Sequence, residues 1–356
     1  MVAWSAFVVL AFIPEALLNP SFQMSYGAVI ALIAGYEVVQ PRLTRWRAPG
    51  GWWRVAVLYV GGLVFSSLLA TVATAPFAAF HFNRMTNFGI IANMVAVPLS
   101  GVLVMPAALV GVVLMPFGWE ALGLVPMGWG IAVINDVAVA IAAWPAAVIR
   151  VPAFPIDALA VIVLGALWLC LWRTRWRWGG MAVIAAGCLA AVLARPPDLL
   201  VSPDGRLMAV NPPGGHLMMS SLTGQRFTAE AWLARFAEDQ PAQLASGEGG
   251  GGGLGEGVQC DRFGCLYRAG THVVALVTDA RALVEDCRIA TVLISAVPVR
   301  GSCPSAGIVI DRFDLWRAGA HALWLSDAGV TVESVRDYRG VRPWARAPEA
   351  RRRDQP

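Results

Sequence analysis

Three polar side chains that could contact phosphate lie close together between two apolar runs of the chain: His81, Arg84 and Asn87. Phenylalanines surround them in the sequence, at positions 80, 82 and 88. A basic residue among aromatic rings suits a single-stranded nucleic acid, because phosphates meet the charge while bases stack on the rings. Aromatic residues also anchor helices at a membrane surface. The sequence leaves both interpretations open.

Other polar side chains lie inside the apolar runs or at their ends, notably Gln23, Ser25 and Asn93. Polar groups at membrane depth are costly and therefore often functional. They could line a hydrophilic path through the membrane. Side chains of this kind also form hydrogen bonds between neighbouring helices, and this alternative stays open as well.

Six cysteines divide into two groups. Cys170 and Cys188 fall in apolar runs, where we expect small packing residues. The other four lie in the polar C-terminal part, and they allow three disulfide pairings. The first choice joins Cys260 to Cys265 and Cys287 to Cys303. A four-cysteine zinc site is disfavoured, because only one pair is closely spaced.

The first 195 residues are mostly apolar, and the whole chain is 57% hydrophobic and only 14% charged. A helix needs roughly 20 apolar residues to cross a bilayer. The sequence therefore predicts a polytopic α-helical membrane domain over 1–197. Pro, Gly, Asn and Arg residues separate the apolar runs. They divide the domain into seven candidate spans: 2–18, 22–39, 55–75, 90–115, 122–148, 156–172 and 179–194. The span 90–115 contains Pro98 and Pro106, so we expect it to be kinked but complete.

Arginines gather in two of the connections between these runs, four within 42–54 and three within 173–177. By the positive-inside rule both connections should be cytoplasmic. Four membrane crossings separate the two connections. An even number returns the chain to the same side, so the assignment is self-consistent. The loop 81–88 and everything after Arg195 then lie outside a bacterial inner membrane. Arg84, Arg150 and Arg195 are single exceptions on the outer side.

The pattern changes at Asp198, and residues 198–335 predict a periplasmic α+β module. Its ten arginines are outnumbered by fifteen acidic residues. Helices are expected at 227–236 and 280–289. Strands are expected at 199–201, 207–210, 265–267, 272–277, 291–297, 308–313, 320–325 and 330–335. A glycine-rich loop follows at 247–257, and an arginine-rich tail at 336–356. The glycine run has no Lys-Ser/Thr ending, so a linker is favoured over a nucleotide site.

Several stretches resemble the ComEC-type competence protein family. Residues 19–26 (NPSFQMSY) are similar to that family's segment DPSFQLSF, with Asn19 in place of Asp. Residues 73–76 (ATAP) with 81–82 (HF), and 91–99 (IANMVAVPL), are similar to two further family segments in the same order. A less specific match covers 312–325 (RFDLWRAGAHALWL) and 342–344 (RPW).

The resemblance implies a channel component that carries single-stranded transforming DNA across the inner membrane. It also implies a cytoplasmic DNA-translocating motor and an outer DNA receptor as partners, with membrane lipid around the spans. Gln23, Ser25, His81, Arg84, Asn87 and Asn93 are the candidate residues of the DNA path. The oligomeric state is left open.

Two departures from the family matter. The first run begins abruptly, so we expect the domain 1–197 to be incomplete at its N-terminus. The family's C-terminal domain often resembles a metallo-β-lactamase with an H-x-H-x-D-H motif, whereas this chain has four scattered histidines. We therefore expect a degenerate version of that domain, with no enzyme activity and no cofactor. The alternatives are an envelope scaffold whose module binds a protein, or a non-functional fragment.

Overall fold

The computed structural model describes residues 1–47, 52–220, 225–240, 242–243 and 258–340. The chain divides into two compact units, Met1–Ala194 and Arg195–Pro356, which we call the N-terminal unit and the C-terminal unit. This division falls three residues before the predicted domain boundary at 197/198. Each unit is described by itself.

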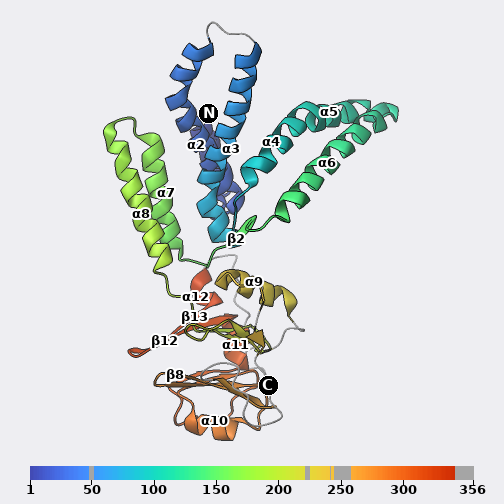
Figure 1. Ribbon diagram of the computed structural model, residues 1–356. Helices are drawn as coiled ribbons and strands as arrows, with labels where there is room; N and C mark the ends of the chain where they lie inside the picture. Colours follow the sequence, from blue (N-terminus) through green and yellow to red (C-terminus); the bar gives the residue numbers. More distant parts are fainter. Residues whose placement is uncertain (48–51, 221–224, 241, 244–257, 341–356) are drawn as a thin grey trace. The chain divides into compact units, whose positions relative to one another are not determined.

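The N-terminal unit is helical, and three pairs of its helices pack as antiparallel hairpins: α2 with α3, α5 with α6, and α7 with α8 (Figure 1). Its α-helices are α1 (Val2–Phe12), α2 (Pro20–Arg47), α3 (Trp52–Phe82), α4 (Gly89–Leu99), α5 (Met105–Leu114), α6 (Ala121–Ala142), α7 (Ile156–Leu171) and α8 (Gly179–Val192). Short 3-10 turns occur at Pro14–Leu18, Met115–Phe117 and Arg175–Trp178.

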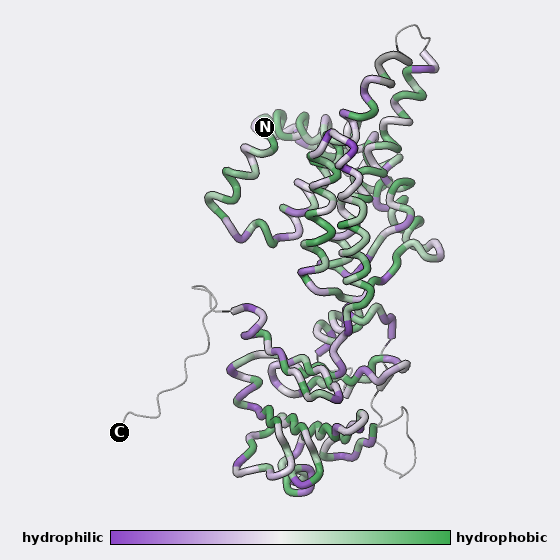
Figure 2. The backbone as a smooth tube through the Cα atoms, turned by 90° about the vertical axis from the view of Figure 1, so that its left-hand side faces the viewer, coloured by the Kyte–Doolittle hydropathy of each residue, from purple (hydrophilic) through white to green (hydrophobic). Residues whose placement is uncertain are grey.

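Large apolar side chains of this unit face outward. Leu122 and Val139 on α6, for example, are 67% and 70% exposed. Figure 2 shows hydrophobic colour running along most of these helices. Water would oppose so much exposed apolar surface, whereas hydrocarbon tails accept it. The N-terminal unit is therefore built for a membrane.

Four segments are long and apolar enough to cross a bilayer: Pro20–Pro41, Trp52–Phe82, Gly89–Phe117 and Ala121–Ala142. They correspond to four of the seven predicted spans. The predicted span 2–18 is broken, because α1 ends at Phe12 and Pro14 opens a separate 3-10 turn. The predicted span 122–148 is too long, because α6 ends at Ala142 and Val148 already belongs to a strand.

Glycines allow the paired helices to approach closely. A Cβ atom added to Gly27 of α2 would lie 2.9 Å from the ring of Phe77 on α3. One added to Gly165 of α7 would lie 2.8 Å from the backbone oxygen of Gly180 on α8, and one on Gly123 of α6 would overlap the α5 backbone. Close backbone contact is how helices associate where no hydrophobic driving force acts between them.

The Pro-containing segment stays helical from Gly89 to Phe117 through a π-helical turn at Ser100–Val104. Pro98 and Pro106 flank this turn and each lacks an N–H donor. A wider turn re-satisfies backbone groups that such residues leave without partners. The segment is thus continuous and bent, as expected of a kinked span (Figure 1).

The C-terminal unit contains two sheets. The six-stranded sheet has the order β13-β12-β3-β4-β5-β6, and all its pairs are antiparallel except β5 with β6. Its strands are β3 (Leu199–Val201), β4 (Met208–Val210), β5 (Met218–Met219), β6 (Ala242–Gln243), β12 (His321–Ser326) and β13 (Gly329–Ser334).

The second sheet has five strands in the order β11-β10-β9-β8-β7. β9 to β11 are parallel, and β7 to β9 are antiparallel. Its strands are β7 (Val258–Cys260), β8 (Gly264–Ala269), β9 (His272–Val277), β10 (Val292–Ser295) and β11 (Ile308–Ile310).

The two sheets stack on a shared core and each carries a helix on its outer face. Residues from both sheets form the central core, including Val201, Val210, Tyr267, Val274 and Ile294. α9 (Arg226–Phe236) covers the six-stranded sheet and α10 (Leu283–Ile289) the five-stranded one. The result is a four-layer arrangement, helix–sheet–sheet–helix (Figure 1).

Most predicted elements of this unit are present with small shifts in their ends. The hairpins expected around Gly205 and Gly270 are the pairs β3–β4 and β8–β9. The predicted strand 308–313 is too long, because Asp311 caps α11 (Arg312–Ala318). The short helix α12 (Val335–Arg339) was missed. The glycine-rich loop 247–257 and tail residues 341–356 lie outside the described residues.

A buried histidine makes the stability of the C-terminal unit depend on pH. His321 of β12 is 7% exposed, and burial lowers the pKa of its imidazole, although Asp314 and Asp337 act in the opposite direction. The unfolded chain, with a histidine pKa of about 6.5, then binds a proton more readily than the folded one. We predict that the unit loses stability as the pH falls from about 7 toward 5.

Hydrogen–deuterium exchange of β12 in the full-length protein measures this effect. His321→Gln removes the titrating group and should flatten the pH dependence. An equally steep profile in that variant would show that another group is responsible.

Candidate functional site

His81 and Gln23, both candidate path residues, lie in contact. The His81 Nε2 atom is 2.8 Å from Gln23 Oε1 and donates to it, since an amide oxygen only accepts. The Gln23 amide nitrogen donates to the backbone oxygen of Leu17 at 2.9 Å. Gln23 therefore ties the end of α3 to the start of α2 and to the preceding turn.

The predicted loop 81–88 is wrong in part. His81 and Phe82 belong to the last turn of α3, which ends because Asn83 adopts a left-handed φ of 53°. Asparagine tolerates this conformation better than most residues. The next three residues form the strand β1 (Arg84–Thr86), which pairs with β2 (Val148–Arg150).

Two asparagines fasten this two-stranded ribbon. The side chain of Asn83 donates to the backbone oxygen of Val151 at 3.2 Å. The side chain of Asn87 donates to the oxygen of Ala146 at 2.8 Å. Ala146 has a φ of 57°, a strained value for alanine that is held in place by such contacts. Asn87 thus has a clear structural use.

The ribbon places two arginines side by side. Arg84 is directly opposite Arg150 in the antiparallel register. Arg84 is exposed and forms no ion pair with any described residue. Like charges directly across a strand pair are unfavourable unless an anion or solvent screens them. Sequence reasoning put both arginines on one side of the membrane but did not predict that they pair.

Aromatic rings lie on both sides of the ribbon. Phe88, which follows β1, meets Trp144 edge to face with ring centroids 5.3 Å apart. Phe80, which precedes it, meets Phe154 at 5.6 Å. These pairs join the segment around β1 to the segment around β2. The charged and aromatic groups needed to hold a phosphate chain and stack bases therefore occur together here.

Two candidate residues are not brought to this cluster. Ser25 is exposed on α2, and Asn93 is half-buried on α4. Among the described residues, neither side chain has a hydrogen bond to His81, Gln23 or the ribbon.

One arginine-rich connection contacts α2. Arg173, between α7 and α8, donates from Nη2 to Glu37 Oε1 of α2 at 2.9 Å. The α7–α8 connection therefore lies at the C-terminal part of α2, as does the start of α3. Arg84 follows the opposite end of α3. Within the N-terminal unit, the two arginine-rich connections thus share one end and the ribbon lies at the other.

Four cysteines of the C-terminal unit form disulfides, Cys260 with Cys265 and Cys287 with Cys303. This is the pairing that the spacing placed first. The first bridge closes the β7–β8 hairpin, where the two cysteines are register partners. The second joins α10 to the segment before β11.

The four histidines lie apart and bind neighbours of different kinds. His272 contacts the backbone oxygen of Ser326, and His321 that of Gly319. His216 is 3.8 Å from a carboxylate oxygen of Glu238. Within the part of the chain that the structure describes, no cluster of three or more His, Cys, Asp or Glu residues could hold a metal ion.

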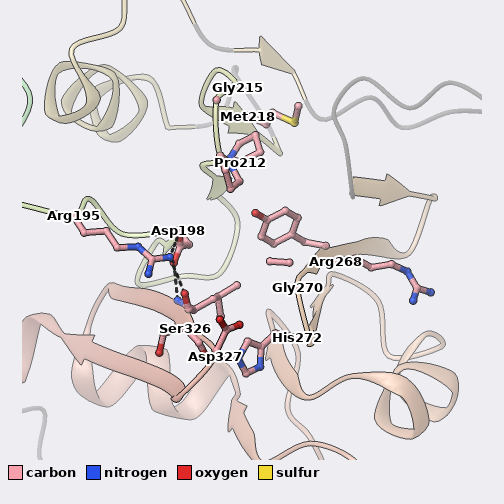
Figure 3. Close-up of a pocket in the computed structure, with 15 residues that line it drawn as sticks. Arg195, Asp198, Pro212, Gly215, Met218, Arg268, Gly270, His272, Ser326 and Asp327 are labelled. Atoms are coloured by element: carbon pink, nitrogen blue, oxygen red, sulfur yellow. Dashed lines mark hydrogen bonds and ion pairs between the residues drawn. The ribbon is translucent and has the colours of Figure 1, made fainter.

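A pocket of about 550 Å³ opens in the C-terminal unit where the β8–β9 and β12–β13 turns approach the loop after β4 (Figure 3). Tyr267 lines it and is 1% exposed, yet its hydroxyl has no hydrogen bond to a described residue. Burial and the charge of Asp198 raise the pKa of this phenol, so it remains a donor. The side chain of Arg268 points away from the pocket in Figure 3. The Tyr267 hydroxyl is thus left for water or a ligand.

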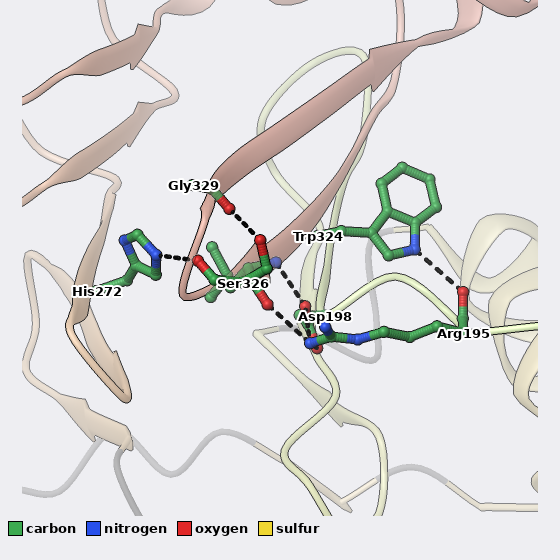
Figure 4. A network of polar contacts seen from close by, with 7 residues as sticks. Arg195, Asp198, His272, Trp324, Ser326 and Gly329 are labelled. Atoms are coloured by element: carbon green, nitrogen blue, oxygen red, sulfur yellow. Dashed lines mark hydrogen bonds and ion pairs between the residues drawn. The ribbon is translucent and has the colours of Figure 1, made fainter.

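One wall of this pocket is a closed polar network (Figure 4). Asp198 accepts from the backbone nitrogen of Leu325 at 2.6 Å and from Arg195 at 3.0 Å. Arg195 also donates to the oxygen of Leu325 at 2.7 Å, and Trp324 donates to the oxygen of Arg195 at 3.1 Å. The network fastens the beginning of the C-terminal unit to β12.

These features define an α-helical membrane protein with a disulfide-bonded αβ unit at its C-terminal side. The model of the Competence protein family matches residues 1–176, nearly the whole N-terminal unit. Over these residues the chain belongs to the competence protein family, which connects it with DNA uptake during natural competence. Neither the curated proteins nor the solved structures contain a match to this chain.

The ribbon register can be tested by cross-linking. Met85 and Ile149 are register partners, so their Cα atoms are expected to lie about 4.5–5.5 Å apart. With both changed to cysteine, and the free Cys170 and Cys188 changed to alanine, mild oxidation should join most molecules. The control Arg84→Cys with Val148→Cys joins positions out of register. Equal cross-linking of both pairs would contradict the ribbon.

The Asp198 network predicts a large local effect. Asp198→Ala leaves the buried N–H of Leu325 without an acceptor, which should lower the opening free energy of β12 by about 2–4 kcal/mol. Hydrogen–deuterium exchange measures this loss. The matched control is Asp279→Ala, which removes an exposed ion pair with Arg281 and should change little. Similar losses in both variants would show that the network adds no special stability.

Proposed function

We propose that this protein conducts single-stranded transforming DNA across the inner membrane as a channel component. The observation that supports this most is the Arg84–Arg150 pair in a family-matched membrane unit, with Phe88 and Trp144 beside it. Two arginines at partner positions of a strand pair favour a phosphate chain, and neighbouring rings favour unpaired bases. In this proposal the ribbon is where the strand enters.

The physical requirement behind the proposal is a wet passage. A phosphate chain cannot cross hydrocarbon, so several helices must enclose a polar path. The bent segment Gly89–Phe117 is the element we assign to this path, because irregular backbone at membrane depth is tolerated mainly where it lines a cavity or packs in protein. Asn93 on α4 is its candidate polar group. Gln23 and His81 would hold the helix ends at the mouth rather than contact DNA.

We further propose the orientation with the arginine-rich connections in the cytoplasm. The ribbon and the C-terminal unit would then be periplasmic. Two disulfides in the C-terminal unit support a periplasmic location for it, since disulfides persist in oxidising compartments. A cytoplasmic motor would supply the energy, and an outer receptor the DNA.

The C-terminal unit would act without catalysis, as a degenerate metallo-β-lactamase-like domain. Its stacked sheets with a helix on each outer face support the likeness. A second candidate function is an envelope scaffold that binds a protein through this unit. The excess of fifteen acidic residues over ten arginines in 198–335 favours that candidate, because an acidic surface repels DNA.

Charge reversal at the ribbon tests the channel. Arg84→Glu with Arg150→Glu should lower the uptake of labelled DNA into the cytoplasm at least about tenfold, because two attractions for phosphate become repulsions. Arg84→Lys with Arg150→Lys keeps the charge and should retain most uptake. Arg262→Glu, an exposed arginine of the C-terminal unit, is the matched control.

Immunoblotting of membranes confirms equal protein levels. Undiminished uptake in the charge-reversed strain, or in a strain lacking the gene, would remove the channel proposal. A scaffold would instead lose a protein partner when the C-terminal unit is altered, with the ribbon variants unaffected.

A further inference from the structure

A second pocket, of about 570 Å³, lies at the arginine-rich end of the N-terminal unit. One side is the C-terminal part of α2, which contributes Val38 and Glu37. The other is the end of α7 and the following turn, which contribute Cys170, Arg173 and Arg177. The pocket therefore combines basic groups with an apolar wall.

Arg177 is the unusual member of this set. Its Nε atom is buried and has no hydrogen-bond partner. Among the described residues, its guanidinium also forms no ion pair, whereas the neighbouring Arg173 is paired with Glu37. A buried donor on a charged group is costly unless something accepts from it. An anion in the pocket would balance the charge of this guanidinium.

Arg173 can serve the same anion. Only its Nη2 atom is engaged by Glu37, and its side chain is 82% exposed. Arginine offers five N–H donors in a fixed fork that matches phosphate geometry. Two arginines on one short connection can thus hold a single phosphate group, while Glu37 fixes the position of one of them.

The side chains around the pocket indicate which class of phosphate compound it would bind. Trp172, Trp176 and Trp178 on the same connection are at least half exposed. Tryptophan side chains collect where lipid headgroups meet hydrocarbon. The connection that carries these tryptophans lies between the last residue of α7 and the first residue of α8. The apolar wall from α2 continues into the outward, lipid-facing surface. A phosphate with acyl chains attached fits this wall, because aliphatic chains pack against aliphatic side chains such as Val38, whereas a nucleic acid has no such chains.

We propose that this pocket binds the phosphate of an anionic phospholipid, with Arg177 as the main donor and Arg173 as the second. Bound lipid would strengthen the contact of α2 with the α7–α8 hairpin, to which the exposed Arg173–Glu37 pair also contributes. Basic pockets at the cytoplasmic ends of membrane helices are a recognised setting for such headgroups. The assignment is independent of DNA conduction.

Native mass spectrometry of the full-length protein in detergent tests this. Phosphatidylglycerol should bind at least about tenfold more tightly than phosphatidylcholine, because charge-assisted hydrogen bonds need an anionic headgroup. Arg177→Gln should weaken phosphatidylglycerol binding about tenfold. Arg175→Gln is the matched control: it removes a charge from the same short turn but not from the pocket, and binding should be unchanged.

Arg177→Lys keeps the charge and guards against misfolding of the neutral variant; it should bind phosphatidylglycerol better than Arg177→Gln and less tightly than the parent. Equal binding of the two lipids, or equal losses in Arg175→Gln and Arg177→Gln, would overturn the proposal. It would also be overturned if inorganic phosphate, or a single-stranded oligonucleotide, bound more tightly than phosphatidylglycerol with the same dependence on Arg177.

Discussion

The outward-facing apolar surface of the N-terminal unit is the constraint on which the rest of the structure depends. Side chains such as Leu122 and Val139 are opposed by water and accepted by hydrocarbon. In that surrounding, burial of apolar groups no longer draws helices together. The helices must instead associate by close backbone approach, and Gly27, Gly123 and Gly165 provide it.

The same constraint controls the irregular backbone. Hydrocarbon offers no hydrogen bonds, so chain that leaves the α-helical pattern needs partners within the protein. The π turn at Ser100–Val104 keeps the segment between two prolines helical. Outside the helices, Asn83 and Asn87 bond the backbone of the β1–β2 ribbon and fix a strained Ala146. The pairing of Arg84 with Arg150 is a consequence of this ribbon.

The C-terminal unit follows the opposite rule. Its apolar strand residues are mostly buried between the two sheets or beneath the helices on their outer faces, as water requires. Polar groups are concentrated where turns meet, and Asp198 and Arg195 close one such junction around Leu325. The Tyr267 hydroxyl beside this junction has no hydrogen bond to a described residue, and it adds a polar group to the pocket there.

Much of the fold was predictable from local patterns. Apolar runs indicated membrane helices, and turn residues at Gly205 and Gly270 indicated the two hairpins that form. The residues at which helices and strands end were less predictable. Pro14 divided one run, and α6 stopped six residues before its run ended. Asp311 turned the end of an expected strand into a helix cap, because a capping box outweighs the β tendency of Phe313.

By itself, the sequence determined the membrane class, the family resemblance and the end at which arginines gather, because composition and short motifs are properties of adjacent residues. The tertiary structure decided that Arg84 faces Arg150, that Gln23 bonds His81, and that the Nε atom of Arg177 lies buried with no hydrogen-bond partner among the described residues. The first two are contacts between positions tens of residues apart, and the third depends on which segments pack around Arg177. Their geometry depends on how helices and turns pack, which no local pattern records.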